Sequence, residues 1–140
     1  MTDRSNLRRL QAAYKAWDAS KGGNQEQWLD LFSDKINIRS MGKENAGLEF
    51  TSACTSREDA IAYFSGLLDA WDMIHWTPDV FIDDGERIAM FGRCGWTNKS
   101  TGKDVEISIA HLWTFSNDKI IEFVEVFDTA RAAAAATPNK

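Results

Sequence analysis

The chain has 140 residues, of which 44% are hydrophobic and 26% are charged, and its formal net charge at pH 7 is -5. This composition predicts one folded, soluble domain with a substantial core. Nucleic-acid binding is not expected, because phosphate recognition needs a basic stripe and the Lys and Arg residues are scattered. No apolar run reaches membrane-spanning length and no signal region precedes the domain, so we expect no membrane contact and a cytoplasmic location.

Cysteine and histidine usage argues against a disulfide framework and against a metal site. Cys54 and Cys94 stand in unrelated contexts, which favours free thiols in a reducing compartment. The two histidines lack metal-ligand spacing, so neither a metal nor another cofactor is expected. Six tryptophans and eight phenylalanines are many for this length. We expect these aromatic residues to fill the core and to form the wall of an apolar pocket.

Three amphipathic segments predict helices in the first half of the chain. The first begins at a cap on Asp3 or Ser5 and ends near Gly22, with a buried stripe of Leu7, Leu10, Tyr14 and Trp17. The second begins after Asn24 and buries Trp28, Leu31 and Phe32. The third begins after Thr55 or Ser56, and its predicted buried face consists of Ala60, Ile61, Phe64, Leu67, Leu68 and Trp71.

A short strand with Ile36 and Ile38 and a long loop separate the second helix from the third. The loop extends from Ser40 to Cys54, and loops of this length are often functional or mobile. Leu48 and Phe50 are apolar, so we expect the loop to border the mouth of a pocket as a lid. The alternative is a loop whose apolar side chains are permanently packed against the third helix.

From Ile74 onward the hydrophobic period changes to two, which predicts four strands. They are expected near residues 74–82, 88–96, 104–115 and 119–127. Helices followed by an antiparallel meander predict an α+β fold, a cone-shaped half-barrel with three N-terminal helices packed on a curved, mostly antiparallel sheet. We expect residues 1–130 to form this single domain and the Ala-rich tail, 131–140, to be poorly ordered.

The last predicted hairpin, residues 104–128, carries one ionisable residue in each apolar stripe. His111 lies in the stripe of Val105, Ile107, Ile109, Trp113 and Phe115, and Glu125 lies in the stripe of Ile121, Phe123 and Phe127. Both stripes face one core only if the loop has an odd length, and residues 116–118 form the expected three-residue turn. His111 is then opposite Phe123 or Glu125, as part of a site or of a satisfied core pair.

The opposite face of the same hairpin is also apolar. Ala110 and Leu112 lie on one strand of that face, and Val124 and Val126 lie on the other. An antiparallel sheet with one solvated face should be polar there. The helices can cover only one face, so we expect a homodimer through the outer face of the sheet.

Four short motifs, taken in order, resemble the nuclear transport factor 2-like superfamily, which includes ketosteroid isomerases and SnoaL-like polyketide cyclases. They are residues 14–17 of the first helix, residues 31–34 before the first strand, residues 56–60 at the start of the third helix and residues 110–128 of the last hairpin. The resemblance implies a cone-shaped half-barrel that encloses a deep apolar pocket, often in a homodimer.

The resemblance also implies roles for particular residues. Tyr14 aligns with the isomerase tyrosine that polarises a carbonyl group, and His111 takes the place of its polarising aspartate. Ser40 or a neighbour replaces the proton-shuttling aspartate, so steroid isomerisation by that route is not expected. SnoaL-like cyclases place an acid late in the last strand near a histidine, and Glu125 or Asp128 with His111 fits that pattern.

These observations leave two classes of function open. In the first, the chain is a cofactor-independent isomerase, cyclase or hydratase that acts on a small apolar carbonyl compound, with His111, Glu125, Tyr14 and Asp128 as catalytic residues. In the second, the same pocket binds a small apolar ligand without turnover, or serves only dimerisation. Each residue also has a structural explanation. His111 could be satisfied in the core by Glu125 or by a backbone carbonyl, and Glu125 could instead pair with Arg39 or Arg93. Tyr14 could only pack, and Asp128 could pair with Arg131 or cap a turn.

Overall fold

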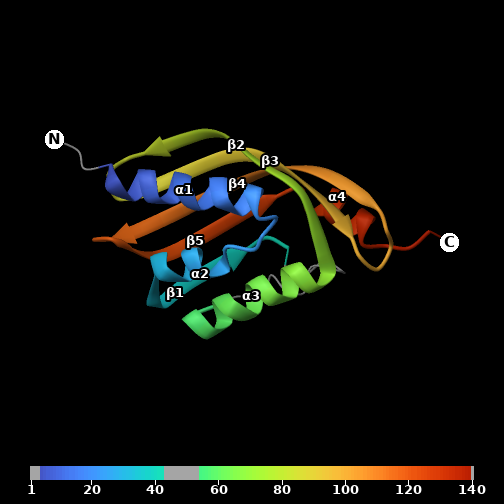
Figure 1. Ribbon diagram of the computed structural model, residues 1–140, viewed down its shortest axis with the longest axis horizontal. Helices are drawn as coiled ribbons and strands as arrows, with labels where there is room; N and C mark the ends of the chain where they lie inside the picture. The colour runs from blue at the N-terminus through green and yellow to red at the C-terminus, as the bar shows by residue number, and fades with distance from the viewer. Residues whose placement is uncertain (1–3, 43–53, 140) are drawn as a thin grey trace.

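The computed structural model describes residues 4–42 and 54–139. Within these residues, helices α1 (Ser5–Ala19), α2 (Gln25–Leu31) and α3 (Arg57–Ala70) lie across one face of a sheet, and a short helix α4 (Thr129–Ala135) follows it (Figure 1). The strands are β1 (Phe32–Ser40), β2 (Trp71–Asp83), β3 (Arg87–Asn98), β4 (Asp104–Ser116) and β5 (Lys119–Phe127). The predicted α+β class and the curved, mostly antiparallel sheet are confirmed.

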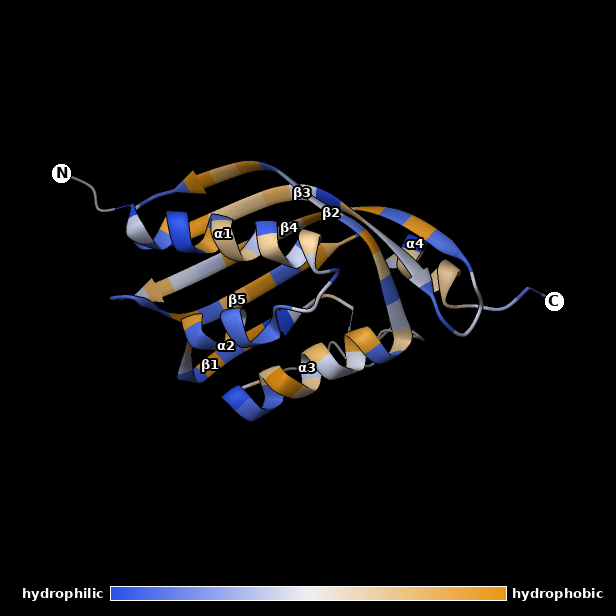
Figure 2. Ribbon diagram, in the orientation of Figure 1, coloured by the Kyte–Doolittle hydropathy of each residue, from blue (hydrophilic) through white to orange (hydrophobic). Residues whose placement is uncertain are grey.

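Within the described residues, the five strands form one sheet in the order β1-β5-β4-β3-β2. Strand β1 pairs with β5 in parallel, whereas the other three pairs are antiparallel. Hydrophobic residues recur along the strands beneath the helices, and hydrophilic residues gather on α1 and α2 (Figure 2). The inner side chains of the sheet therefore pack against the helices, as the period-two pattern predicts.

The ends of the helices have identifiable chemical causes. Helix α3 begins at Ser56, whose hydroxyl accepts a hydrogen bond from the Asp59 N–H at 3.1 Å, as predicted. Helix α1 ends before Lys21 and Gly22, which have positive φ angles of 52° and 89°. The predicted cap of α1 on Ser5 is wrong, because Ser5 is already the first helical residue and the N-cap position belongs to Arg4.

Two aromatic residues predicted on helices instead begin strands. Phe32 starts β1 and Trp71 starts β2, and both are buried. The buried face of α3 also differs from the prediction, since Ile61 is 45% exposed and Tyr63 is buried. Helix α3 ends at Ala70 and therefore does not include Trp71, and its buried residues are Ala60, Tyr63, Phe64 and Leu67.

The β4–β5 hairpin has the predicted inner face on β4, but its turn and the first part of β5 differ from the prediction. Ser116 pairs with Lys119, so the loop contains two residues, Asn117 and Asp118, and Asn117 has a positive φ of 57°. The register then shifts between the Thr114–Glu122 and Phe115–Ile120 pairs. This bulge supplies the extra residue that the parity argument required.

The bulge also corrects the predicted inner stripe of β5. Ile120 is fully buried, whereas Ile121, which was predicted to face the core, is 38% exposed. Beyond the bulge, Phe123 and Glu125 regain the inner face and are both buried.

The C-terminal segment begins with the short helix α4. Asp128 caps α4, and its carboxylate accepts a hydrogen bond from the Arg131 N–H at 3.0 Å. Ala132 and Ala135 of this helix are buried. The predicted lid lies mostly in residues 43–53, outside the described residues. None of the described helices has the length and apolar composition needed to cross a membrane.

Candidate functional site

A cavity of about 80 Å³ lies between the helices and the inner face of the sheet. All six tryptophans of the chain line it. Among the described residues, twelve aromatic side chains form its wall: Tyr14, Trp17, Trp28, Phe32, Tyr63, Phe64, Trp71, Trp76, Trp96, Trp113, Phe123 and Phe127. The six tryptophans, predicted to fill the core and to form a pocket wall, are all buried around this cavity. Its use for a small, mostly apolar ligand stays a prediction.

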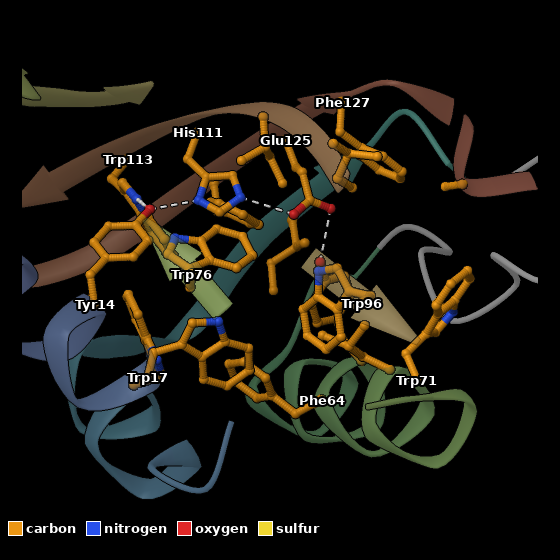
Figure 3. Close-up of a pocket in the computed structure, with 18 of the residues that line it drawn as sticks. Tyr14, Trp17, Phe64, Trp71, Trp76, Trp96, His111, Trp113, Glu125 and Phe127 are labelled. Atoms are coloured by element: carbon orange, nitrogen blue, oxygen red, sulfur yellow. Dashed lines mark hydrogen bonds and ion pairs between the residues drawn. The ribbon is translucent and has the colours of Figure 1, made fainter. Parts of the chain in front are cut away.

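His111 and Glu125 are the ionisable pair of this cavity (Figure 3). They occupy directly opposite positions on β4 and β5, and each is 6% exposed. The His111 Nε2 atom lies 2.9 Å from the Glu125 Oε2 atom. The predicted contact between the two side chains on one buried face is confirmed, while their catalytic role stays a prediction.

Tyr14 of α1 extends this pair into a chain of hydrogen bonds. Its hydroxyl oxygen lies 2.5 Å from the Nδ1 atom of His111. The indole Nε1–H of Trp113 donates to the same hydroxyl oxygen at 2.7 Å. The order Trp113, Tyr14, His111, Glu125 is therefore continuous, and we call these four residues the relay.

The hydrogen-bond donors of the relay determine which protonation states of His111 and Glu125 leave every polar group of the relay paired. Tyr14 accepts from Trp113, so its own hydroxyl proton is free to donate to Nδ1 of His111. His111 then carries its single proton on Nε2 and donates it to Glu125. A doubly protonated His111 would leave the Tyr14 proton without an acceptor among the described residues. The arrangement that satisfies every group is a neutral His111 beside an ionised Glu125.

Glu125 is held by two further hydroxyl groups. Ser40 Oγ and the Tyr63 hydroxyl both donate to its Oε1 atom, at 2.8 Å and 2.9 Å. Burial raises the pKa of Glu125, whereas the hydrogen bonds from His111, Ser40 and Tyr63 lower it, and the overall direction is downward. We therefore treat Glu125 as a carboxylate at neutral pH.

The two tyrosines remain phenols under the same conditions. Burial is the main cause that raises the pKa of Tyr14 and of Tyr63 well above the ordinary value. A further contribution comes from the nearby charge of Glu125. Tyr14 can therefore give up its proton only if His111 takes it in the same step.

Two tryptophans that line the cavity have unpaired indole N–H groups. The indole Nε1 atoms of Trp28 and Trp76 are buried and have no hydrogen-bond partner within residues 4–42 and 54–139. The ring of Trp76 stacks on that of His111 at 5.3 Å. Buried donors are normally paired, so these two N–H groups are available to an acceptor atom of a ligand.

The structure separates the predicted site residues into two groups. Tyr14, His111 and Glu125 come together, whereas Asp128 is an N-cap of α4 and is not among the lining residues. Ser40 was aligned with the isomerase base but serves as a donor to Glu125. Tyr63 was missed, although its spacing from Ala60 and Leu67 is that of an inner helix face.

No group of three or more His, Cys, Asp or Glu side chains within the described part of the chain could hold a metal ion. Cys54 is also a poor nucleophile, because burial and the nearby Asp59 raise its pKa to about 11. The chemistry available in the cavity is thus that of the relay and its hydroxyl neighbours.

Three helices over a curved sheet, closed around an apolar pocket, define a protein of the nuclear transport factor 2-like superfamily. The SnoaL-like domain family matches residues 10–123, so the chain belongs to that family. A search of curated protein sequences gave no significant match.

Solved structures with the same fold cover almost the whole chain. A nuclear transport factor 2-like protein of unknown function from Burkholderia pseudomallei K96243 is 22% identical, with a TM-score of 0.82, and the match covers 94% of this chain and 97% of that one. A protein with a ketosteroid isomerase-like fold from Catenulispora acidiphila DSM 44928, in complex with trimethylamine, is 15% identical, with a TM-score of 0.72 and coverages of 89% and 92%. A candidate SnoaL-like polyketide cyclase from Jannaschia sp. CCS1 is 15% identical, with a TM-score of 0.73 and coverages of 99% and 100%.

Proposed function

We propose that the chain binds a small, mostly apolar carbonyl compound in the aromatic cavity and moves a proton on it. The activity would be that of a cofactor-independent isomerase, cyclase or hydratase. The observation that carries this proposal is the relay, a buried chain of hydrogen bonds from Tyr14 through His111 to Glu125 that forms part of the cavity wall. The neighbour from Jannaschia, named as a candidate SnoaL-like polyketide cyclase, supports the same class of chemistry.

The relay would work by two linked proton transfers. The Tyr14 oxygen takes a proton from carbon next to the carbonyl group while the Tyr14 hydroxyl proton moves to His111 Nδ1. The imidazolium that forms is stabilised by the Glu125 carboxylate, to which its Nε2–H already donates. The unpaired indole N–H groups of Trp28 and Trp76 are the donors available to the developing enolate oxygen. Return of the proton to a different atom completes an isomerisation.

A second candidate function is ligand binding without turnover. Each polar group of the relay already has a partner inside the protein. Ser40 also stands where the resembling isomerases carry their base, and it donates to Glu125 instead of accepting a proton. These two facts favour a binding module whose polar groups only shape the pocket.

One pair of measurements separates these functions. Binding of 2-tetralone, a small aromatic ketone, is measured by thermal shift, because a ligand selective for the native state raises its stability. Exchange of the acidic 2-tetralone protons is then followed by NMR in D₂O. We expect a shift and faster exchange with the wild-type chain, and exchange at the background rate with Tyr14→Phe. Binding without faster exchange would establish the second function, and no binding would contradict both.

We also propose a homodimer through the outer face of the sheet. The pairing of β2 to β5 places eight apolar residues there in two adjacent rows. The first row is Val80, Phe91, Ala110 and Val126, and the second is Ile82, Ala89, Leu112 and Val124. Val80, Ile82, Phe91 and Val126 are each about half exposed, and an apolar patch across four strands is typical of an interface between subunits.

Light scattering at micromolar concentration tests this interface. We expect the mass of a dimer for the wild-type chain and of a monomer for Val126→Lys, because the substitution places a charge in the patch. Ile61→Lys is the matched control, since Ile61 is similarly exposed but lies on α3. A monomeric wild-type chain, or equal loss of dimer in both variants, would contradict the proposed interface.

A further inference from the structure

We infer that the ligand of this cavity carries an alkylated ammonium group, which the surrounding aromatic rings hold against Glu125. The inference rests on the proposed small-molecule function and adds the charge and chemical class of one part of the ligand. It follows from the charge balance of the cavity, from the chemistry of its walls and from the hydrogen bonds already made by Glu125.

Among the described residues, the cavity contains an ionised acid without a Lys or Arg to balance it. Glu125 is the only Asp or Glu that lines the cavity within residues 4–42 and 54–139, and no Lys or Arg of these ranges lines it. Its described hydrogen-bond partners are the hydroxyls of Ser40 and Tyr63 and the imidazole of His111. The tautomer of His111 set by Tyr14 and Trp113 is neutral. The cluster therefore keeps one buried negative charge, which a bound cation would offset.

The walls of the cavity suit a cation that is bulky and apolar on its outside. Trp17 and Trp76 meet at 78°, and Trp76 and Trp96 meet at 82°, with ring centroids 6.4 Å apart in both pairs. Aromatic faces attract cations, tryptophan most strongly, and boxes of such rings are known to bind quaternary ammonium groups. Figure 3 draws Trp96 and Phe127 on the Glu125 side of the cavity and Tyr14 and Trp113 on the far side of His111.

The hydrogen bonds of the site favour an alkylated over a primary ammonium group. A primary ammonium has three N–H donors and needs an acceptor for each. The Glu125 carboxylate already accepts three hydrogen bonds from the chain, and the rest of the wall is mainly aromatic and aliphatic. A quaternary group has no N–H to satisfy, and a tertiary group has only one.

A matched pair of probes isolates the charge of the ligand. Choline and 3,3-dimethylbutan-1-ol have nearly the same shape, but the second carries carbon in place of the charged nitrogen. Their dissociation constants for the wild-type chain are measured by calorimetry. A desolvated cation–π site with a carboxylate should bind choline more tightly by about tenfold or more.

Two variants with the same change in net charge locate the effect. Glu125→Gln removes the buried charge with little change of shape and should reduce the preference for choline to about threefold or less. Glu58→Gln removes an exposed charge at the start of α3 and should leave the preference intact. Near-ultraviolet circular dichroism and retained binding of 2-tetralone check that Glu125→Gln is folded.

The outcomes distinguish this inference from the function on which it rests. Equal binding of the two probes, or binding of 2-tetralone with neither probe bound, overturns the ammonium inference and leaves the proposed function standing. Failure of all three compounds to bind overturns both. A preference for choline that survives in Glu125→Gln also contradicts the inference, because the buried carboxylate is then not the cause.

Discussion

Substitution of Tyr14 by Phe tests whether the relay exists in solution. The change removes one oxygen atom and keeps the aromatic ring, which is 1% exposed and packs edge-on against Trp28 at 5.0 Å. That oxygen accepts from Trp113 and donates to His111. Tyr14→Phe therefore leaves two buried polar groups without partners and should alter the packing of the ring little.

The expected loss of stability follows from those two groups. A buried donor or acceptor that loses its partner costs about 1–3 kcal/mol, so two of them should cost about 2–6 kcal/mol in the free energy of unfolding. The lower end applies if a water molecule enters the space left by the oxygen atom and bridges the two nitrogen atoms. This is a large share of the stability of a typical domain, about 5–15 kcal/mol.

Urea denaturation followed by circular dichroism measures the change, with the slope compared between variants to confirm that the folded states are equally compact. Tyr63→Phe is the matched comparison, because it also removes a buried hydroxyl, while Glu125 keeps the hydrogen bonds from Ser40 and His111. We expect Tyr63→Phe to cost less than Tyr14→Phe. A cost below about 1 kcal/mol for Tyr14→Phe, or equal costs for both variants, would refute the relay as described.

Three further substitutions have defined outcomes. The pKa of Glu125 is lowered in the folded state, so its ionised form stabilises the fold at pH values above the unfolded pKa of 4.5, and this contribution is lost as the pH falls from 4.5 through the folded pKa. The stability of wild type should therefore fall more steeply with acid than that of Glu125→Gln, and parallel curves of stability against pH for the two chains would contradict this. Ser56→Ala removes the α3 cap and should cost about 1 kcal/mol in urea denaturation, whereas Ser65→Ala at an exposed position within the helix should not destabilise. Gly92→Ala would put a Cβ atom 2.5 Å from the Thr77 carbonyl oxygen, so a loss of about 1–3 kcal/mol is expected, and an unchanged urea midpoint would show that β2 and β3 can separate there.

The sequence was sufficient to predict the pairing of His111 with Glu125, although it gave the wrong turn. The parity argument depends only on which residues face the core, and that face is strongly specified wherever one side of a sheet is buried. It does not depend on how the chain reverses. A two-residue turn at Asn117 with a bulge near Ile121 meets the same requirement as a three-residue turn. The register at the site was therefore predictable, and the local geometry of the turn was not.

Contacts between distant elements were harder to predict. Phe32 and Trp71 were assigned to helices because each continues a helical spacing of apolar residues. In the structure α2 passes directly into β1 and α3 directly into β2, with no polar linker to mark the junction. An apolar residue at such a junction fits either element, because both bury it.

The same limit explains why Ser40 and Tyr63 were not predicted as partners of Glu125. Ser40 and Tyr63 are 85 and 62 residues away from it in sequence. Ser40 becomes its neighbour only because β1 pairs with β5 in parallel, with Ser40 opposite Glu125. A single sequence carries little information on which non-consecutive strands pair, so the parallel pairing and the shell of hydroxyls that it creates required the structure.

The free-energy cost of burying the polar groups of the relay indicates whether these groups serve only to stabilise the fold. Replacing a buried polar cluster by apolar residues of similar volume is often neutral or stabilising, so a carboxylate beside a histidine is a poor way to fill a core. In this chain the cluster adjoins a cavity that twelve aromatic residues line, and those residues could have filled the space more stably by closing on one another. A buried charge next to open space is better explained by a ligand whose binding depends on that charge. On this reasoning an apolar replacement of the pair, His111→Leu with Glu125→Leu, should unfold at a similar or higher urea concentration than wild type and should lose the preference for choline over 3,3-dimethylbutan-1-ol. A large loss of stability in this double variant would instead indicate that the pair serves the fold.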